Sequence, residues 1–445
     1  MKSWTGVRDR LVAETLPWTL RAYRYAMAAA TPFAPLFIAR RLRRGKEHPQ
    51  RLSERYGEAR IPRPAGPLLW LHGASIGEIL AVVPLIRHMQ EQNFNILLTS
   101  GTVTSAKLAE TRMPDGVLHQ FVPLDAPLFV KRFLKHWRPD VALFIESDLW
   151  PNLIAAAATR HVPLIIVNGR MSEKSFNRWN AFPKTISALL RQFDLCLAQS
   201  AADASRLSDL GAPRIATTGN LKLDVPAPPT DQRKLEALKR AIRQRPVIAA
   251  VSTHPGEDEI IIDVHRRLRH SFPGLLTIIA PRHPERGADI AQIATGAGVP
   301  TFRRTQRSVP DRATEIFIAD TLGELGLIYK LAPVVFIGGS LVPHGGQNPI
   351  EPVKQGSVVL HGPHVWNFAE IYAALDAGRG AELVSDGGKL TVRIGALLKD
   401  IAARDTMAGH ARDTVDKLGG ALNRTLSELE PYLIQLRITR RAADA

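Results

Sequence analysis

The sequence has 445 residues, of which 45% are hydrophobic and 22% are charged, a composition that excludes a disordered or low-complexity chain. This length predicts two domains, because single domains cluster near roughly 100–200 residues. The one cysteine, Cys196, excludes an intramolecular disulfide, and its apolar neighbours favour a small buried side chain in a reducing compartment. The net charge is +16 and is unevenly distributed.

About half of that charge lies at the N-terminus, where the first 60 residues hold thirteen Lys or Arg against five Asp or Glu. Residues 25–39 are apolar, and four arginines follow at Arg40, Arg41, Arg43 and Arg44. The apolar run is shorter than the roughly 20 residues that span a bilayer, and a secretory signal would place its basic block first. We therefore expect residues 1–50 to associate with a membrane surface. The alternative is a buried helix followed by a solvated basic turn.

From residue 67 onward, short apolar runs alternate with helix-like stretches. Continuous hydrophobicity is typical of strands covered on both faces, as in a parallel sheet flanked by helices. The expected strands are residues 68–72, 95–99, 141–145, 163–167 and 194–198, then 247–251, 275–280, 315–319, 334–338 and 357–360.

A proline-rich segment at 224–231 separates the two groups of strands and has the composition of a semi-rigid linker. The sequence thus predicts an α/β protein of two Rossmann-like, doubly wound parallel sheets that face a cleft. The expected domains are 51–223 and 232–445. Ligands of such sheets bind at the carboxyl ends of the strands, so the loops there are the candidate sites.

The first candidate loop, residues 71–78, leaves the first expected strand and contains Gly73, Gly77 and Glu78. A carboxylate on a rigid strand-to-helix turn is well placed to take a proton from an acceptor hydroxyl. Ser75-x-x-Glu78 is also the pattern of a capping box, which needs both side chains only for the helix start. Spacing alone does not separate the two roles.

Two further loops end strands of the same domain. Glu146 and Asp148 follow the strand at 141–145, where acids are favoured as site residues, although Asp148 could simply cap the next helix. Lys222 stands beside the linker and could bind a phosphate or a carboxylate, although lysines are common on surfaces.

The predicted C-terminal domain offers three candidate loops. Arg282, between Pro281 and His283, follows an apolar strand on a loop stiffened by prolines and is suited to clamping a phosphate. The segments 320–325 and 345–351 each contain glycine and enter a helix. Asn348-x-x-Glu351 is a capping box by itself, yet a helix start also offers free N–H groups to a nucleotide phosphate.

Several common motifs are absent from the sequence: Asp-x-Asp, His-Glu-x-x-His, the Walker A loop, and Gly-x-Gly-x-x-Gly after the first strand. A metal-dependent sugar transferase, a zinc hydrolase, a P-loop kinase and a dehydrogenase each lose their usual marker. We therefore expect neither a metal nor a cofactor.

Taken together, the loops resemble the Kdo transferase family, membrane-associated enzymes that add 3-deoxy-D-manno-octulosonic acid (Kdo) to the lipid A precursor. The motifs that carry the resemblance are Ala74-Ser-Ile-Gly-Glu78, Glu146-Ser-Asp-Leu-Trp-Pro-Asn152, Gly219-Asn-Leu-Lys222, Pro281-Arg-His-Pro-Glu285 and Gly345-Gly-Gln-Asn348. The resemblance implies a GT-B fold, CMP-Kdo as the donor, inversion at the anomeric carbon, and no metal. It also implies lipopolysaccharide synthesis at the cytoplasmic face of the cell inner membrane.

The resemblance also assigns roles to domains and residues. Domain 51–223 would bind the acceptor, and domain 232–445 would bind the nucleotide sugar. Glu78 matches the catalytic base, and Glu146 and Lys222 match residues that assist the transition state. The positions matching CMP-binding segments are Pro281, Arg282, Leu322, Gly323, Glu324, Asn348, Pro349, Ile350 and Glu351.

Two alternative functions are compatible with the same sequence. Another GT-B enzyme with a different donor, or a nucleotide-sugar epimerase, would share the fold, but an epimerase would have no use for a membrane-associating N-terminus. A nucleic-acid-binding protein would fit the basic charge, but aromatic residues make up only 6% of the chain and much of the charge adjoins an apolar segment.

Overall fold

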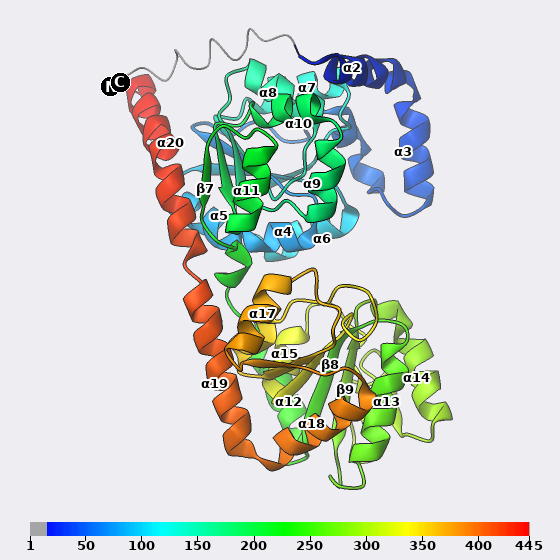
Figure 1. The fold of residues 1–445 in the computed structure, drawn as a ribbon. Helices are drawn as coiled ribbons and strands as arrows, with labels where there is room; N and C mark the ends of the chain where they lie inside the picture. The colour runs from blue at the N-terminus through cyan, green and yellow to red at the C-terminus, as the bar shows by residue number, and fades with distance from the viewer. Residues whose placement is uncertain (1–15, 445) are drawn as a thin grey trace. The chain divides into compact units, whose positions relative to one another are not determined.

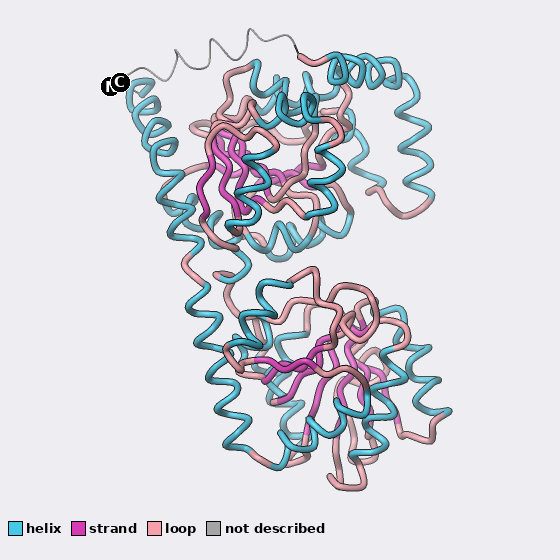
Figure 2. The backbone as a smooth tube through the Cα atoms, in the orientation of Figure 1, coloured by secondary structure: helices cyan, strands magenta, loops and turns pink. Residues whose placement is uncertain are grey.

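The computed structural model describes residues 16–444, which form two compact units, each built on a parallel sheet (Figure 1). Unit 1 contains the described chain up to Val225 and again from Gly419, and unit 2 is Pro226–Leu418. Helices flank the strands of both sheets (Figure 2), which is the arrangement that continuous apolar strands require. The predicted α/β class with two doubly wound parallel sheets is confirmed.

The sheet of unit 1 has the strand order β3-β2-β1-β4-β5-β6-β7, and all of its strands are parallel. Its strands are β1 (Leu68–His72), β2 (Asn95–Ser100), β3 (Leu118–Phe121), β4 (Val141–Ile145), β5 (Leu164–Gly169), β6 (Leu195–Ala198) and β7 (Ile215–Thr217). Its helices are α2 (Trp18–Ala30), α3 (Ala34–Arg43), α4 (Ile76–Ala81), α5 (Val83–Glu91), α6 (Val103–Arg112), α7 (Pro127–Trp137), α8 (Pro151–Thr159), α9 (Glu173–Asn180), α10 (Pro183–Leu190), α11 (Ala201–Asp209) and α20 (Ala421–Asp444). Short 3-10 turns are η1 (Thr31–Phe33), η2 (Pro49–Tyr56) and η3 (Leu221–Leu223).

Strand β1 shows why this sheet needs helices on both faces. All five of its residues are buried, and successive side chains point to opposite faces. Leu68 and Trp70 pack in a core with residues of α7, α8 and α10. Leu69 and Leu71 pack in a second core with residues of α4, α5 and α20.

Unit 2 repeats the plan with the strand order β10-β11-β9-β8-β12-β13-β14, again all parallel. Its strands are β8 (Val247–Thr253), β9 (Leu276–Pro281), β10 (Thr301–Arg303), β11 (Ile316–Ile318), β12 (Val334–Ile337), β13 (Val358–His361) and β14 (Ala381–Leu383). Its helices are α12 (Gln232–Ile242), α13 (Glu257–Leu268), α14 (Gly287–Gly296), α15 (Leu325–Leu331), α16 (Ile350–Gln355), α17 (Ala369–Ala377), α18 (Gly387–Lys399) and α19 (Ile401–Leu418), with a 3-10 turn η4 (Pro284–Arg286).

Each sheet of the described chain has seven strands, whereas the sequence predicted five. The ten expected strands are all present, and the four additional ones are β3, β7, β10 and β14. These four are the edge strands of the two sheets. They have three or four residues and are largely half-buried or polar, so none presents the continuous apolar run that identifies an inner strand.

The C-terminal segment differs from the predicted domain 232–445. Residues from Gly419 onward belong to unit 1, where α20 packs on α5 and η3. Ala421, Leu429 and Leu433 are buried in the core that also holds α4 and α5. The apolar face of α20 thus completes unit 1, and Pro226–Leu418 forms a unit inserted within it.

The N-terminal segment begins, for the described residues, with α2 and α3 on the surface of unit 1 (Figure 1). Residues 1–15 of the predicted membrane segment lie outside the described residues. Leu20, Ala34 and Ile38 face inward, while large apolar side chains stay exposed: Trp18, Tyr25, Phe33, Leu36 and Phe37. Among residues 16–444, no helix has the length and apolar character needed to cross a bilayer.

Candidate active site

The three residues expected to be catalytic lie in unit 1, on loops at the carboxyl ends of strands. Glu78 follows β1 in the first turn of α4, and Glu146 directly follows β4. β1 and β4 are neighbours at the point where the strand order reverses, which is where doubly wound sheets bind ligands. Lys222 lies in η3, after β7, and its Nζ donates to Glu146 Oε1 at 2.6 Å.

The Glu146–Lys222 pair is held by constrained backbone. Glu146 has a left-handed φ of +62°, which is unusual for a residue with a Cβ and is typical of functional sites. Its N–H donates to the carbonyl of Val167 on β5. On the other side, Asn220 caps η3 by accepting from the N–H of Lys222 at 3.0 Å. Both charged side chains are mostly buried, with 16% and 20% of their surfaces exposed.

Glu78 takes part in the helix start that its spacing predicts. Ser75 Oγ accepts from the N–H of Glu78 at 3.4 Å and donates to Glu78 Oε1 at 2.6 Å, and Glu78 Oε2 accepts from the N–H of Ala74 at 2.7 Å. Burial raises the pKa of Glu78, the Ser75 and Ala74 hydrogen bonds oppose the rise, and the charges of Glu146 and Asp148 add to it. The carboxylate therefore takes part in the helix start and has a pKa above its ordinary value, while its role as a base stays a prediction.

A buried histidine, missed in the sequence, supports the same loops. His72, the last residue of β1, is fully buried, with Nδ1 2.9 Å from Thr99 Oγ1 and Nε2 3.1 Å from Asp148 Oδ2. Burial would raise the pKa of Asp148, but the hydrogen bond and charge of His72 bring it below its ordinary value. The only sequence signal was that a polar residue ends an otherwise apolar strand.

In unit 2, Arg282 follows the last residue of β9, the buried Pro281. Its N–H donates to the carbonyl of Thr253 on β8, while its guanidinium is exposed and has no partner among the described residues. Arg286, four residues later, is instead bound to the buried carboxylate of Asp258 and to Thr253 O. The loop thus uses one arginine for structure and leaves the other available for an anion.

Three histidines that the sequence analysis did not single out as a group lie beside Arg282. The rings of His254, after β8, and His344, after β12, stack with centroids 4.2 Å apart, and His283 lies 6.4 Å from His254. Burial, followed by the charges of the two other histidines and of Arg282 and Arg286, lowers the pKa of His254 to about 4. Its Nε2 is buried without a hydrogen-bond partner among the described residues.

Glu257 connects the loops that carry His254 and His344, and the sequence analysis did not identify it. Its side chain is fully buried, and its two oxygens accept from the N–H groups of His254, Gly339, Ser340 and Leu341 at 2.6–3.0 Å. It joins the loops after β8 and β12, which are neighbours where the strand order of this sheet reverses.

The turn Leu322–Gly323–Glu324 precedes α15, as expected. Leu322 is 74% exposed, and Gly323 has a φ of +81°. Glu324 accepts two hydrogen bonds from Arg304, at 2.9 and 3.1 Å, and one from Lys234 at 2.7 Å. The Arg304 hydrogen bonds are the largest cause that lowers the pKa of Glu324 to about 2, so this carboxylate has a structural role.

At the start of α16, the side chain of Asn348 contacts both Ile350 and Glu351. Asn348 Oδ1 accepts from the N–H of Ile350 at 3.0 Å, and Asn348 Nδ2 lies 3.4 Å from Glu351 Oε1, with Pro349 between them. Asn348 thus caps the helix start, and the nucleotide-binding role of this segment stays a prediction. Within residues 16–444, no group of three or more His, Cys, Asp or Glu side chains is arranged to hold a metal ion.

Solved structures similar to this chain share its fold at low sequence identity. A UDP-GlcNAc 2-epimerase from Neisseria meningitidis aligns with a TM-score of 0.57 at 13% identity, covering 82% of this chain and 100% of that one. A glycosyltransferase from Rickettsia africae aligns with a TM-score of 0.56 at 12% identity, covering 83% and 99%. The fold therefore defines a GT-B-type protein, a class whose solved members include both sugar transferases and epimerases.

Sequence relatives are more specific. Residues 50–225 match the family described as 3-deoxy-D-manno-octulosonic-acid transferase (kdotransferase). A 3-deoxy-D-manno-octulosonic acid transferase from Haemophilus influenzae is 34% identical over 420 residues, 92% of this chain and 98% of the relative. One from Bordetella pertussis is 35% identical over 425 residues, 92% and 99%. The chain belongs to the Kdo transferase family, and the predicted resemblance is confirmed.

Proposed function

We propose that this glycosyltransferase moves Kdo from CMP-Kdo to a glucosamine hydroxyl of the lipid A precursor, lipid IVA, in lipopolysaccharide core synthesis. We further propose that transfer inverts the anomeric carbon and needs no metal ion. The observation that carries the proposal is the grouping of Glu78 with the Glu146–Lys222 pair at the carboxyl edge of one sheet. This is the arrangement of a base beside a held positive charge.

In this mechanism Glu78 takes the proton of the acceptor hydroxyl. The hydroxyl oxygen then attacks the anomeric carbon of Kdo from the face opposite the phosphate, and the bond to the phosphate breaks with its electron pair leaving on CMP. A general base works best when its pKa lies near the working pH, and burial moves the pKa of Glu78 in that direction. Lys222, oriented by Glu146, supplies positive charge for the charge that develops in the transition state.

The donor would be held by unit 2. The guanidinium of Arg282 is exposed and is unpaired within the part of the chain that the structure describes, so it could bind the CMP phosphate through charge-assisted hydrogen bonds. The start of α16, at Asn348, Pro349, Ile350 and Glu351, would also contact CMP. Because Pro349 has no N–H and the N–H of Ile350 donates to Asn348 Oδ1, we infer that this segment contributes the positive end of the helix dipole. Since the carboxylate of Glu324 is already occupied by cations, we infer that the turn Leu322–Gly323–Glu324 contributes through its backbone.

The overall reaction is tested by incubating purified protein with CMP-Kdo and lipid IVA and measuring the mass of the lipid product. We expect the mass of Kdo to be added only when both substrates are present. Conversion of a nucleotide sugar without any lipid would identify an epimerase and overturn the proposal. No addition of Kdo to lipid IVA by folded, CMP-binding protein would reject the acceptor.

Replacing Arg282 with Ala is expected to weaken CMP binding by about 1.5–3 kcal/mol, the typical worth of a hydrogen bond to a charged group. Isothermal titration calorimetry with CMP measures this change in affinity. The control is Arg266→Ala, which replaces an exposed arginine on α13 of the same unit and should bind CMP as the wild type does.

The metal-free mechanism has its own test. Activity that is lost in EDTA and restored by a divalent ion would contradict it.

We also propose that the protein works at the cytoplasmic face of the inner membrane, held there by α2 and α3. Their exposed side chains combine aromatic groups, such as Trp18 and Tyr25, with arginines. Aromatic and aliphatic groups enter the acyl boundary while arginines meet anionic headgroups. Not every arginine is free for this role, because Arg41 donates to the buried Glu47, which also accepts from Arg55.

Replacing Arg40, Arg43 and Arg44 with Gln is expected to weaken binding to anionic vesicles by up to about 3 kcal/mol, at about 1 kcal/mol for each charge. Arg41 is kept so that Glu47 remains paired. Vesicle sedimentation over a range of salt concentrations measures the effect, and binding should fall with salt because the attraction is screened. Membrane retention that resists both high salt and the substitutions would reject a peripheral association.

A further inference from the structure

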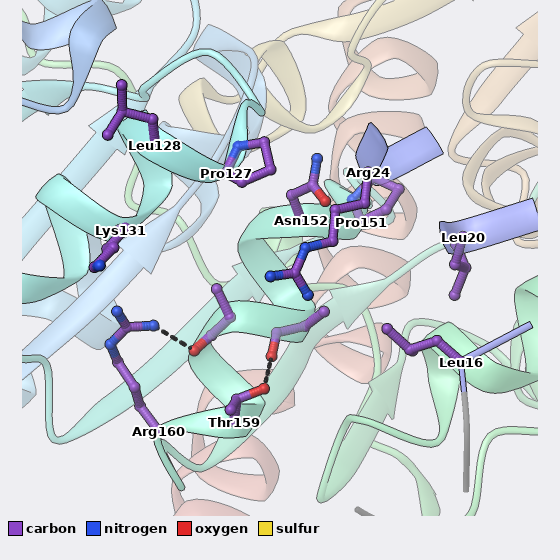
Figure 3. A pocket seen from close by; sticks show the side chains of 12 residues that line it. Leu16, Leu20, Arg24, Pro127, Leu128, Lys131, Pro151, Asn152, Thr159 and Arg160 are labelled. Carbon is purple, nitrogen blue, oxygen red and sulfur yellow. Dashed lines mark hydrogen bonds between the residues drawn. The ribbon is translucent and has the colours of Figure 1, made fainter. Parts of the chain in front are cut away.

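A groove of about 330 Å³ lies on unit 1 between α2, α7 and α8 (Figure 3), and its described lining includes none of Glu78, Glu146 and Lys222. One wall is formed by Leu16 and Leu20 at the start of α2, and the opposite wall by the first half of α7. The floor is α8 from Pro151 to Thr159, followed by Arg160. Since a helix rises 1.5 Å per residue, this floor is roughly 13 Å long, which makes an elongated site rather than a round one.

The charged residues among the described lining of the groove are all cationic. They are Arg24, Lys131 and Arg160, and no Asp or Glu is found among the described residues that line it. All three cationic side chains are exposed, and among the described residues none of them makes an ion pair. Arg160 Nη1 donates to the carbonyl of Ala156, which holds its guanidinium along α8. Figure 3 shows Lys131 and Arg160 on one side of the groove, opposite Leu16 and Leu20, with Arg24 between them.

Most of the remaining lining is apolar, together with the polar side chains of Asn152 and Thr159. Leu128 on α7 is 47% exposed at the rim, and Ala155 and Ala156 on α8 are partly exposed at the floor. On the same N-terminal segment, Trp18 and Tyr25 of α2 are 73% and 74% exposed. An elongated groove with mostly apolar walls and a cationic rim is complementary to an anionic amphiphile that lays one acyl chain along it.

The groove is preformed, because specific contacts fix α2 against the rest of unit 1. Tyr23 donates to Asp125 Oδ2 at 3.0 Å, and Thr19 Oγ1 lies 2.6 Å from Thr185 Oγ1 on α10. Asp125 in turn accepts from the N–H groups of Asn152 and Leu153 at the start of α8. The wall and the floor are thus joined through one buried carboxylate.

We propose that this groove binds one anionic phospholipid of the membrane, with its phosphate among Arg24, Lys131 and Arg160 and an acyl chain along α8. Charge complementarity selects an anionic headgroup, and the length of the floor selects a chain over a compact anion. Phospholipid binding at this groove is separate from sugar transfer, because it requires neither the donor nor the acceptor of the reaction.

The test is calorimetric titration of the full chain with monomeric dihexanoyl phosphatidylglycerol, below its micellar concentration. We expect saturable binding of one molecule. The variant with Arg24, Lys131 and Arg160 all replaced by Gln should bind at least tenfold more weakly. In the matched control, three exposed basic residues outside the groove are replaced by Gln: Arg21 on α2, Lys135 on α7 and Lys184 on α10. Its affinity for the lipid should stay within twofold of that of the wild type.

A second variant, Ala155→Phe, fills the floor without changing charge and should also weaken lipid binding at least tenfold, with an unchanged melting temperature. Inorganic phosphate that binds as tightly as the lipid would show a simple anion site and overturn the proposal. Equal weakening by the control variant would show diffuse electrostatic attraction instead. Competition between the phospholipid and lipid IVA for this groove would show that it binds the acceptor and would overturn the proposal. Equally tight binding of dihexanoyl phosphatidylcholine would show that the three cations do not select an anionic headgroup.

Discussion

The Glu78→Gln variant is expected to bind CMP as the wild type does and to transfer Kdo with a kcat lower by 10²–10⁴, the range that general bases contribute. Glutamine keeps a carbonyl oxygen that can accept from the N–H of Ala74, so the start of α4 should survive while the base is lost. The measurement is kcat from initial rates with CMP-Kdo and lipid IVA, together with calorimetric titration of CMP.

Ser75→Ala is the matched control for Glu78, because it removes the other half of the capping box. It should cost about 1 kcal/mol of stability and leave most of the turnover. In the wild type, activity should be lost as the pH falls through the raised pKa of Glu78, since the base must be deprotonated. A Glu78→Gln variant that keeps more than about a tenth of the wild-type kcat would show that Glu78 is only a cap.

Replacing Glu257 with Ala is expected to lower the unfolding free energy of unit 2 by at least about 3 kcal/mol, because four backbone N–H groups lose their acceptor and each stranded buried donor costs about 1–3 kcal/mol. In a unit of this size that corresponds to a melting temperature lower by roughly 6 °C or more. Thermal unfolding followed by calorimetry measures the change.

Glu257→Gln should fall between the wild type and Glu257→Ala, because one carbonyl oxygen remains to accept one of the two pairs of N–H groups. Glu259→Ala changes an exposed acid in the same turn of α13 and should alter stability by less than about 0.5 kcal/mol. If Glu257→Ala melted with the wild type, the carboxylate would not be holding the loops after β8 and β12, and the His254–His344 stack would need another explanation.

The inner strands of both sheets could be predicted because burial on two faces leaves a direct mark on the sequence. β1 and β4 are apolar at nearly every position, and the loops that follow them carry Glu78 and Glu146. The edge strands could not be found in this way, since β10 and β14 are covered less and tolerate polar residues. The position of α20 could not be predicted either. Its apolar residues indicate that one face is buried, but they do not indicate which unit that face packs against.

The residues of the candidate site also differ in how far the sequence could predict them. The residues found from the sequence stand on loops whose glycines, prolines and charges are conspicuous, as at Arg282 and Asn348. Those missed, His72 and Glu257, act inside the protein through partners distant in the chain. Glu257 stands in a run of acids at a helix start, where sequence alone suggests a solvated charge. Only the fold brings Gly339, Ser340 and Leu341 to its carboxylate.

The insertion of unit 2 within unit 1 has a consequence for how the protein is made. The ribosome completes the strands of unit 1 well before it synthesises α20, and about 190 residues of unit 2 come between. At 5–20 residues per second this delay is roughly 10–40 s. Throughout that time the surfaces of α5 and η3 that Leu429 and Leu433 will cover remain open. Newly made chains therefore carry an unfinished apolar face into the cell, which makes early termination before residue 421 a direct route to aggregation or degradation.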